Sequence, residues 1–319
     1  MKPPYEITSE ILALITSISE KIGEINSANL QKPPTELRKR NRIKTIHSSL
    51  IIEGNTLTED QITAIFENKR VIGPKKDIIE VQNAIKLYDK LNEYNPLSLD
   101  SFCKAHFILM KDLVDSPGKL RNKPVGIMKG KELAHLAPPS ERVKSLMTDL
   151  FKYLKNDKEI LLIKSCVFHY ETEFIHPFLD GNGRMGRLWQ TVILNSKYPV
   201  FEYLPVETII REKQAEYYTS LSKSDKAGKS TAFIEFMLEV INEALDNLLN
   251  SQNYSVGQKD RLNLAKELFR IDSFSRQEYL RFFKKISTAT ASRDLKYGVD
   301  EGFLEKVGDK RLTKYKFKK

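Results

Sequence analysis

Apolar side chains recur at helical spacing along most of the chain, which predicts a largely α-helical protein. Hydrophobic residues three or four positions apart mark each predicted helix, and segments with glycine, proline or polar residues separate the helices. The predicted helices cover residues 7–25, 35–53, 59–66, 77–94, 99–114, 140–154, 159–174, 184–194, 211–222 and 231–249. A capping box at Thr58 and Gln61 opens the third of them.

The section 118–139 interrupts this helical rhythm. It contains three glycines and three prolines around the short apolar piece Val125-Gly126-Ile127-Met128. Glycine and proline favour turns, and a short apolar run between them is typical of a strand. We therefore predict a small β-hairpin here, with His135 in the same section.

A polar stretch at 251–255 predicts a domain boundary. After it come predicted helices at 262–270, 276–283 and 288–302, and then an alternating segment, 303–317, that suggests a β-hairpin around Gly308. This order resembles a winged-helix module, in which residues 287–295 would open the recognition-type helix. We expect three parts, namely a helical segment 1–95, a helical domain 96–250 and a winged-helix domain 255–319.

Charge is concentrated in the predicted C-terminal domain. The chain of 319 residues has a net charge of +10, and residues 255–319 hold 17 basic and 9 acidic side chains, a net of +8. A basic domain can contact DNA phosphates. Winged helices also serve in dimerisation or partner docking, and the fold alone does not decide between these roles.

Composition excludes two classes of protein. No apolar run is long enough to span a membrane, and the N-terminus lacks the pattern of a signal peptide, so we expect a cytoplasmic protein without membrane contact. Cys103 and Cys166 lie in apolar helical segments without metal-ligand spacing, which indicates core thiols.

Residues 176–187, HPFLDGNGRMGR, bring together the side chains needed to bind and react a nucleotide phosphate. His176 has an ordinary pKa near neutrality and is a candidate proton acceptor for an attacking hydroxyl. Asp180 is an oxygen ligand of the kind that Mg²⁺ uses together with substrate phosphates. His106 and His169, in contrast, lie in helical segments, where we expect a packed core histidine and a structural support of the site.

The second half of the run predicts an anion site at the start of a helix. Gly181, Asn182 and Gly183 can turn successive backbone amides inward, and the apolar run that follows Arg184 predicts a buried helix. Backbone amides and the dipole at a helix N-terminus favour phosphate. Arg184 and Arg187 share the first-turn face and can bind phosphate oxygens.

The run resembles the signature of the Fic family, His-x-Phe-x-(Asp/Glu)-Gly-Asn-Gly-Arg-x-x-Arg, with every defined position filled. The resemblance implies transfer of AMP from ATP to a Ser, Thr or Tyr hydroxyl of a protein, with release of pyrophosphate. It implies His176 as base and Asp180 as the ligand of Mg²⁺. It also implies phosphate contacts from Gly181, Asn182, Gly183 and Arg184, with Arg187 at the γ phosphate. The expected fold is an all-α Fic core with a small β-hairpin flap, followed by the winged helix-turn-helix domain.

A second motif lies at the end of the predicted helix 35–53. Residues 49–54, SLIIEG, fit the pattern (Ser/Thr)-x-x-x-Glu-(Gly/Asn), which resembles the inhibitory helix of autoinhibited Fic proteins. Ser49 and Glu53 are spaced to lie on one helix face. The resemblance implies that Glu53 pairs with Arg187 and blocks the γ phosphate.

The resemblance also assigns residues around the nucleotide. In sequence order the hairpin section matches the family's flap, which holds the target by β-augmentation, and this would bring Ile127, Met128, Lys129 and Gly130 near the nucleotide. Tyr218 would lie beside the adenine, with Asp225 in its vicinity. The partner is then a protein with a hydroxyl side chain, including the chain itself. Two alternatives stay open, a DNA-binding regulator whose Fic core senses nucleotide, and removal of AMP by the same site.

Overall fold

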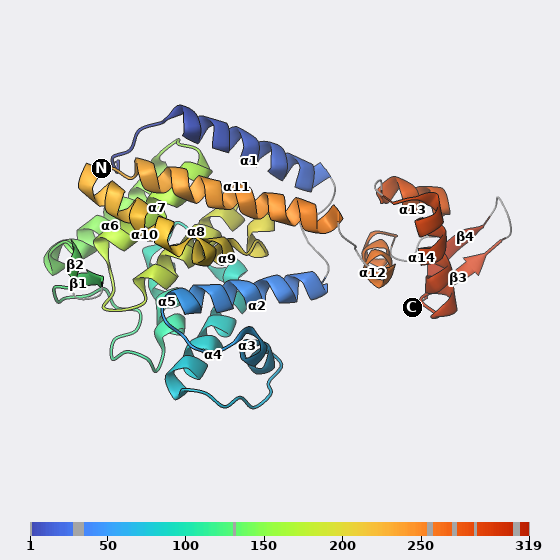
Figure 1. The fold of residues 1–319 in the computed structure, drawn as a ribbon, viewed down its shortest axis with the longest axis horizontal. Coiled ribbons are helices and arrows are strands. Elements are labelled where there is room, and N and C mark those ends of the chain that lie inside the picture. The colour runs from blue at the N-terminus through green and yellow to red at the C-terminus, as the bar shows by residue number, and fades with distance from the viewer. Residues whose placement is uncertain are drawn as a thin grey trace. The chain divides into compact units, whose positions relative to one another are not determined.

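The computed structural model describes residues 2–27, 35–129, 132–253, 258–269, 273–283, 286–308 and 313–318. It divides into two compact units, Met1–Asp246 and Asn247–Lys319, drawn in Figure 1. Both units are mainly helical, as predicted. Within the described residues no helix is long and apolar enough to cross a membrane.

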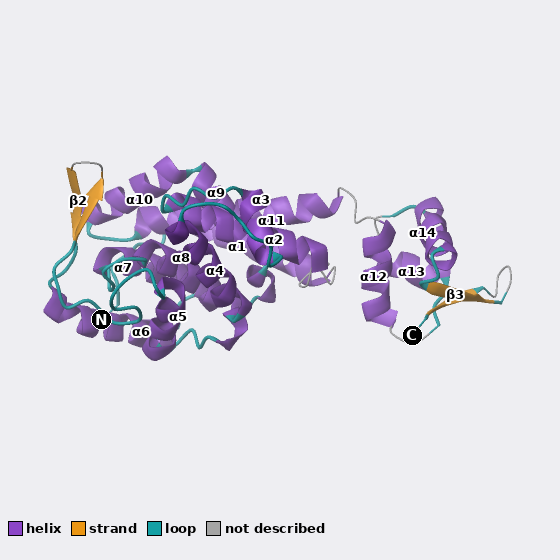
Figure 2. Cartoon of the chain, turned by 90° about the horizontal axis from the view of Figure 1, so that it is seen from below, coloured by secondary structure: helices purple, strands orange, loops and turns teal. Residues whose placement is uncertain are grey.

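The first unit consists of helices and one hairpin, and the last of its helices extends beyond Asp246. Its elements are α1 (Ser9–Ser27), α2 (Thr35–Ile52), α3 (Glu59–Phe66), α4 (Lys75–Asp89), the 3₁₀ helix η1 (Leu91–Glu93), α5 (Leu99–Met110), β1 (Gly126–Lys129), β2 (Glu132–Leu136), α6 (Ser140–Asn156), α7 (Leu161–Ile175), α8 (Asn182–Asn195), η2 (Pro199–Glu202), α9 (Val206–Glu212), α10 (Gln214–Ala227) and α11 (Thr231–Asn253). Strands β1 and β2 pair antiparallel within the section predicted to form a hairpin, and Figure 2 shows them standing out from the helices.

Several helix boundaries follow from local sequence. The predicted capping box at α3 is confirmed, because the Thr58 side chain accepts from the backbone of Gln61 and the Gln61 side chain accepts from the backbone of Thr58. Helix α2 ends at Ile52, and two residues later Gly54 has a φ of +90°. A left-handed glycine after the last turn is a frequent helix stop. Glu53, the one residue between them, therefore lies at a defined point just after the helix.

Other boundaries depend on tertiary contacts that the pattern did not reveal. The prediction of one helix over 99–114 is wrong at its end, because α5 stops at Met110. The side chain of Asn83 on α4 donates to the carbonyls of Leu109 and Lys111, and Asp112 has a φ of +62°. The amide thus satisfies carbonyls at the helix end, where the chain changes direction.

Two segments that were each predicted as one helix are divided into two helices in the structure. The predicted helix 77–94 is α4 followed by η1, and the predicted helix 211–222 is the last part of α9 followed by α10. Lys213 separates α9 from α10 and has ψ +33°. The short helix α9 packs against α2, which also contacts α8.

A cluster of aromatic rings supports the α7–α8 pair. Phe102, Phe168, Phe178 and Trp189 are fully buried, and the ring of Phe102 lies 5.0–5.9 Å from the other three, between centroids. Aromatic pairs at such distances add stability beyond burial of area. Phe178 belongs to the loop between α7 and α8, so this loop is held in the core.

The N-terminal helix covers one side of the unit. Figure 1 shows α1 lying along α11, and side-chain contacts run the length of the pair. Thr8 donates to Glu235 over 2.7 Å, and Lys21 pairs with Asp246. Helix α1 therefore stabilises the long helix that closes the first unit.

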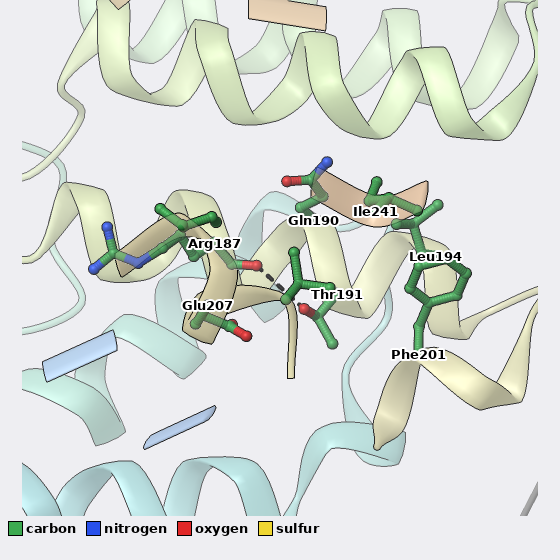
Figure 3. A pocket seen from close by; sticks show the side chains of 9 residues that line it. Arg187, Gln190, Thr191, Leu194, Phe201, Glu207 and Ile241 are labelled. Atoms are coloured by element: carbon green, nitrogen blue, oxygen red, sulfur yellow. Dashed lines mark hydrogen bonds between the residues drawn. The ribbon is translucent and has the colours of Figure 1, made fainter. Parts of the chain in front are cut away.

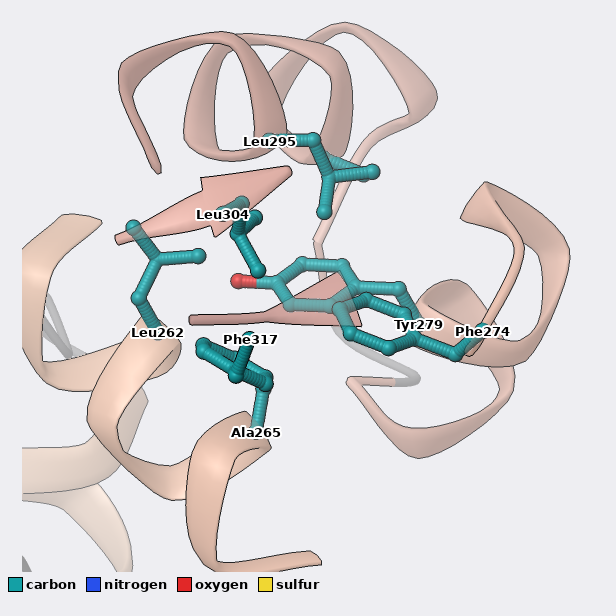
Figure 4. Close-up of a cluster of buried hydrophobic side chains, with 8 residues drawn as sticks. Leu262, Ala265, Phe274, Tyr279, Leu295, Leu304 and Phe317 are labelled. Carbon is teal, nitrogen blue, oxygen red and sulfur yellow. The ribbon is translucent and has the colours of Figure 1, made fainter. Parts of the chain in front are cut away.

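The second unit has its own core. Its elements are α12 (Gln258–Phe269), α13 (Arg276–Phe282), α14 (Thr288–Asp300), β3 (Leu304–Val307) and β4 (Lys314–Phe317). Strands β3 and β4 are antiparallel, and Phe274 forms an isolated antiparallel bridge with Tyr315. Figure 4 shows side chains from the helices and strands converging on Tyr279, with Leu262 from α12, Leu295 from α14 and Leu304 from β3.

Candidate active site

His176 caps the C-terminus of α7 and contacts the last turn of that helix. Pro177 has no backbone N–H, so the carbonyl of Glu173 has no donor four residues ahead. His176 takes the left-handed φ of +51°, and its Nδ1 lies 3.2 Å from that carbonyl. A carbonyl only accepts, so Nδ1 carries the proton and Nε2 is the basic nitrogen of the ring. The geometry thus selects the tautomer that a general base needs.

The loop after His176 is shaped by its own side chains. Asn182 is buried, and its amide accepts from the Phe178 N–H at 2.8 Å and donates to the Phe178 carbonyl at 2.9 Å. Gly181 has a φ of +84°, and a Cβ there would lie 2.8 Å from the sulfur of Met110. The side chain of Asn182 therefore holds the turn, which leaves its backbone amide, rather than its side chain, as the candidate phosphate contact.

Asp180 and His106 face each other across this loop. The Asp180 side chain is 52% exposed, and its Oδ1 accepts from the Gly181 N–H at 2.6 Å. His106 is buried and stacks on Phe178, with ring centroids 3.6 Å apart. It accepts from the Gly118 N–H at Nδ1 and donates from Nε2 to the Asp180 carbonyl, and burial lowers its pKa to about 4. The interpretation of His106 as a packed core histidine is confirmed.

The predicted inhibitory motif lies against Arg187. Oε1 of Glu53 is 2.7 Å from Nη2 of Arg187, and the same guanidinium donates to the hydroxyl and the carbonyl of Ser49 at 3.2 and 3.1 Å. Arg187 is 2% exposed. Although burial opposes its charge, the Glu53 carboxylate raises the pKa of Arg187. Removing one partner from such a pair leaves a poorly compensated buried charge.

The carboxylate of Glu53 also lies over the start of α8. A Cβ built on Gly183 would be 2.6 Å from Oε1 of Glu53, so only glycine admits the carboxylate so close to the backbone. Gly183 is the second residue of α8, where free backbone amides and the helix dipole attract an anion. Glu53 therefore occupies the position at which this helix would bind a phosphate.

Arg184 points to a different carboxylate. Its Nη1 lies 3.1 Å from Oε1 of Glu80 on α4, and its Nη2 lies 3.4 Å from Oδ1 of Asp180. The other oxygen of Glu80 accepts from the Asn55 amide at 2.8 Å. Asn55 is two residues beyond Glu53, so Glu80 connects Arg184 to the segment that carries the inhibitory glutamate.

A buried polar network lies behind Arg187. Tyr217 on α10 lies within hydrogen-bond distance of Glu173 and of His169, at 3.2 and 3.1 Å, and His169 also bonds Gln190. Burial raises the pKa of Glu173 to about 7, and the charge of Glu53 adds to this effect. Burial lowers the pKa of His169 to about 3, so this ring is neutral. Glu173 also lies near the start of α8, because a Cβ built on Gly183 would be 3.4 Å from its Oε1.

A small cavity adjoins Arg187 on another side. Its volume is about 10 Å³, room for no more than one water molecule. Figure 3 shows Arg187 and Glu207 at one end of it, with Leu194 and Phe201 at the other. Oε1 of Glu207 accepts from Tyr88 at 3.2 Å, and burial raises the pKa of Glu207 to about 7.

We expect Glu207→Gln to weaken the pH dependence of stability. A carboxyl group whose pKa rises on folding stabilises the folded chain at low pH, and this contribution is lost as pH rises from about 4.5 to 7. The thermal midpoint of the wild type should therefore fall more between pH 5 and pH 8 than that of the variant, on the order of a few degrees. Glu171 and Glu173, whose pKa values burial also raises to about 7, leave part of the dependence in place. An equal fall in both proteins contradicts the assignment, and Glu212→Gln, exposed on the same helix, is the control.

The residues assigned to adenine and target lie on separate elements. Tyr218 is 39% exposed on α10, beside the buried ring of Tyr217. Burial raises the pKa of Tyr218, and the charge of Glu53 acts in the same direction. Asp225 accepts from Tyr170 at 2.8 Å. Strand β1 contains Ile127, Met128 and Lys129, whereas Gly130 lies outside the described residues.

Two buried residues near the motif were missed from the sequence. Glu80 had a usable signal, because Asp77, Glu80 and Asn83 repeat every three residues on the apolar face of α4, and all three are buried. Arg121 had none, since it is a lone arginine in the glycine- and proline-rich section. Its guanidinium donates to the backbone at the C-terminus of α7.

Comparisons with known proteins agree with this fold and motif. The model of the Fic/DOC family matches residues 96–194. A Fic family protein from Desulfovibrio desulfuricans G20, solved by crystallography, is 38% identical and superposes with a TM-score of 0.77, covering 100% of this chain and 98% of the other. The chain therefore belongs to the Fic/DOC family.

Curated relatives are more distant. The protein adenylyltransferase fic-1 of Caenorhabditis elegans is 28% identical over 265 residues, which are 75% of this chain and 49% of the relative. The protein adenylyltransferase Fic of Nematostella vectensis is 28% identical over 272 residues, 80% of this chain and 59% of the relative. The chain thus spans about half the length of the curated relatives that it matches.

Proposed function

We propose that this protein is an adenylyltransferase that moves AMP from ATP to a Ser, Thr or Tyr hydroxyl of a protein, its own chain included. The observation that carries the proposal is the complete motif at the α7–α8 junction, with His176 at the end of one helix and the residues from Gly181 to Arg184 at the start of the next. The names of the curated relatives support the same reaction.

The proposed step is an in-line displacement at the α phosphorus. Nε2 of His176 accepts the proton of the target hydroxyl, and the hydroxyl oxygen forms a bond to the α phosphorus. The bond from the α phosphorus to the bridging oxygen breaks, and pyrophosphate leaves. Backbone amides of Gly181, Asn182 and Gly183 would bind the phosphates together with Arg184, and Arg187 would contact the γ phosphate. Most of the catalysis is then positioning and charge stabilisation.

Asp180 fits the role of a Mg²⁺ ligand. Its carboxylate is half exposed at the mouth of the phosphate site, and one of its oxygens already accepts a backbone N–H. Among the described residues no group of three or more His, Cys, Asp or Glu side chains could hold a metal by itself. This agrees with an ion held by one carboxylate and by nucleotide phosphates, whose charge it would offset.

The hairpin and α10 would orient the two substrates. Strand β1 is proposed to add the target's backbone as a further strand near Ile127, Met128, Lys129 and Gly130, which aligns the hydroxyl with the α phosphorus. Tyr218, with an exposed ring face on α10, is proposed to stack on the adenine. Both assignments rest on the family resemblance.

Glu53 is proposed to inhibit this activity. Its carboxylate pairs with Arg187 and lies against Gly183, so a γ phosphate and Glu53 compete for one arginine and one helix start. Ser49 keeps the guanidinium in the position that Glu53 requires. An alternative within the same site is removal of AMP from a modified target, with Glu53 orienting a water molecule.

The transferred group can be tested with two labelled donors. Glu53→Gly protein is incubated with Mg²⁺ and with ATP labelled on either the α or the γ phosphate, and label on protein is measured after denaturing separation. We expect incorporation from the α position alone. Incorporation from the γ position contradicts adenylyl transfer and indicates phosphate transfer instead.

The second unit is proposed to be a winged-helix domain that contacts DNA. Its order of helix, bridge, two helices and a strand pair supports this fold, and its basic charge supports the partner. Arg293 and Lys296 are exposed on α14, and Ser292 beside them is half-buried. A role in dimerisation or partner docking remains the competing proposal for the same unit.

We expect any DNA binding by this unit to weaken steeply with salt, because phosphate contacts release counterions. Changing Arg293 and Lys296 together to Ala should reduce the slope of log affinity against log salt by about 2. Lys197→Ala, an exposed lysine of the first unit, is the matched control and should leave the slope unchanged. Affinity insensitive to salt contradicts phosphate-led binding.

A further inference from the structure

Arg121 is a buried arginine whose side chain donates hydrogen bonds to backbone carbonyls. It is 4% exposed, and its three guanidinium nitrogens donate to four carbonyl oxygens between 2.5 and 3.2 Å away. Burying a guanidinium is costly unless its donors are satisfied. Such an arrangement requires that all four carbonyls be held in fixed positions around one planar group.

Two of these carbonyls belong to the end of α7. Nε of Arg121 donates to the carbonyl of His176 at 2.7 Å, and Nη2 donates to that of Ile175 at 3.2 Å. The backbone N–H of Arg121 also donates to the carbonyl of Pro177 at 2.8 Å. The last carbonyls of a helix lack partners within the helix and carry partial negative charge, so a cation is favourable there.

The other two carbonyls are the roots of the hairpin. Nη1 donates to Lys123, three residues before β1, at 3.0 Å, and Nη2 donates to Pro138, two residues after β2, at 2.5 Å. One guanidinium therefore fixes both ends of the hairpin and the backbone of His176 at once.

The contact acts on the residue whose conformation most needs support. A left-handed φ costs a non-glycine residue about 1–2 kcal/mol, and His176 adopts +51°. That conformation directs Nδ1 to the Glu173 carbonyl and so determines the basic nitrogen. If His176 leaves the left-handed conformation, its Nδ1–H no longer donates to the Glu173 carbonyl. The ring then has no fixed tautomer and no fixed position relative to the hairpin.

We propose that Arg121 is a positioning residue. It holds the base at His176 in a fixed position relative to the hairpin that presents the target hydroxyl. This inference rests on the proposed adenylyl transfer for its kinetic consequence, and on geometry alone for the state of the His176 ring. Arg121 itself touches neither substrate. It acts through the backbone carbonyls of His176, Lys123 and Pro138.

The test compares Arg121→Lys and Arg121→Gln with a control substitution, Arg142→Lys, at an exposed arginine on α6. All three are introduced into Glu53→Gly protein, which is the parent. Lysine keeps the charge but concentrates its donors on one nitrogen, so it cannot bridge the helix end and both hairpin roots. We expect kcat of Arg121→Lys to fall on the order of 10- to 100-fold, with KM for ATP unchanged and KM for the target protein raised. Arg142→Lys should match the parent.

A second readout does not depend on transfer. ¹⁵N NMR of protein labelled at its histidines reports the tautomer of the His176 ring, and the measurement is made in the absence of nucleotide. We expect Nδ1–H in the parent and a mixture of tautomers in Arg121→Lys protein that still unfolds cooperatively, at a lowered thermal midpoint. If the parent shows no transfer, adenylylation fails, while the NMR result still decides the role of Arg121. The inference is overturned if Arg121→Lys protein keeps both the tautomer and the kinetics of the parent. It is also overturned if Arg121→Lys and Arg121→Gln both fail to fold, because Arg121 then serves only to stabilise the fold.

Discussion

Glu53→Gly is expected to raise AMP transfer on the order of 10- to 100-fold, the range of a typical coupling between two sites. The carboxylate of Glu53 occupies the start of α8 and holds Arg187 through a contact of 2.7 Å. Glycine removes both, and the arginine becomes available to the γ phosphate. Initial rates of label incorporation from α-labelled ATP measure the change.

The comparison needs a control that loses an ion pair elsewhere. Glu6 pairs with Lys229 at 2.9 Å, and its side chain is 67% exposed. Glu6→Gly should leave the rate at the wild-type level, because this pair lies on the surface and contributes little. Equal rates in wild type and Glu53→Gly, with both proteins folded, contradict autoinhibition by Glu53.

His176→Ala, introduced into Glu53→Gly protein, is expected to lower transfer by roughly 100- to 10,000-fold, the contribution typical of a general base. The position has a φ of +51°, which asparagine tolerates better than alanine. His176→Asn is therefore the matched variant that removes the base and retains the backbone. Thermal midpoints and ATP binding should stay close to those of the parent in both.

Retained transfer with either His176 variant rules out this ring as the essential base. Lost transfer together with lost ATP binding points instead to collapse of the loop, which the Asn182 side chain holds by hydrogen bonds to the backbone of Phe178. The asparagine variant separates the two outcomes, because it places less strain on that loop.

Local patterns predicted most elements of the first unit. Apolar spacing located α1, α2, α6, α7 and α11, and the capping box at Thr58 fixed the start of α3. The run after Arg184 predicted the buried helix α8. These features are local, so a window of a dozen residues contains the information that they need.

Contacts between distant residues could not be predicted in the same way. The end of α5 depends on Asn83, and the state of Arg184 depends on Glu80, 104 residues earlier in the chain. The pairing of Glu53 with Arg187 was expected only because a family pattern implied it. Periodicity shows that Asp77, Glu80 and Asn83 share a buried face, but it does not show what they meet there.

The most direct test of the account compares wild type, Glu53→Gly and the double variant Glu53→Gly/His176→Ala, each incubated with α-labelled ATP and Mg²⁺. We predict weak label on protein in wild type, strong label in Glu53→Gly and none in the double variant. Absence of label from Glu53→Gly, on itself and in cell lysate, would contradict adenylyl transfer by this site.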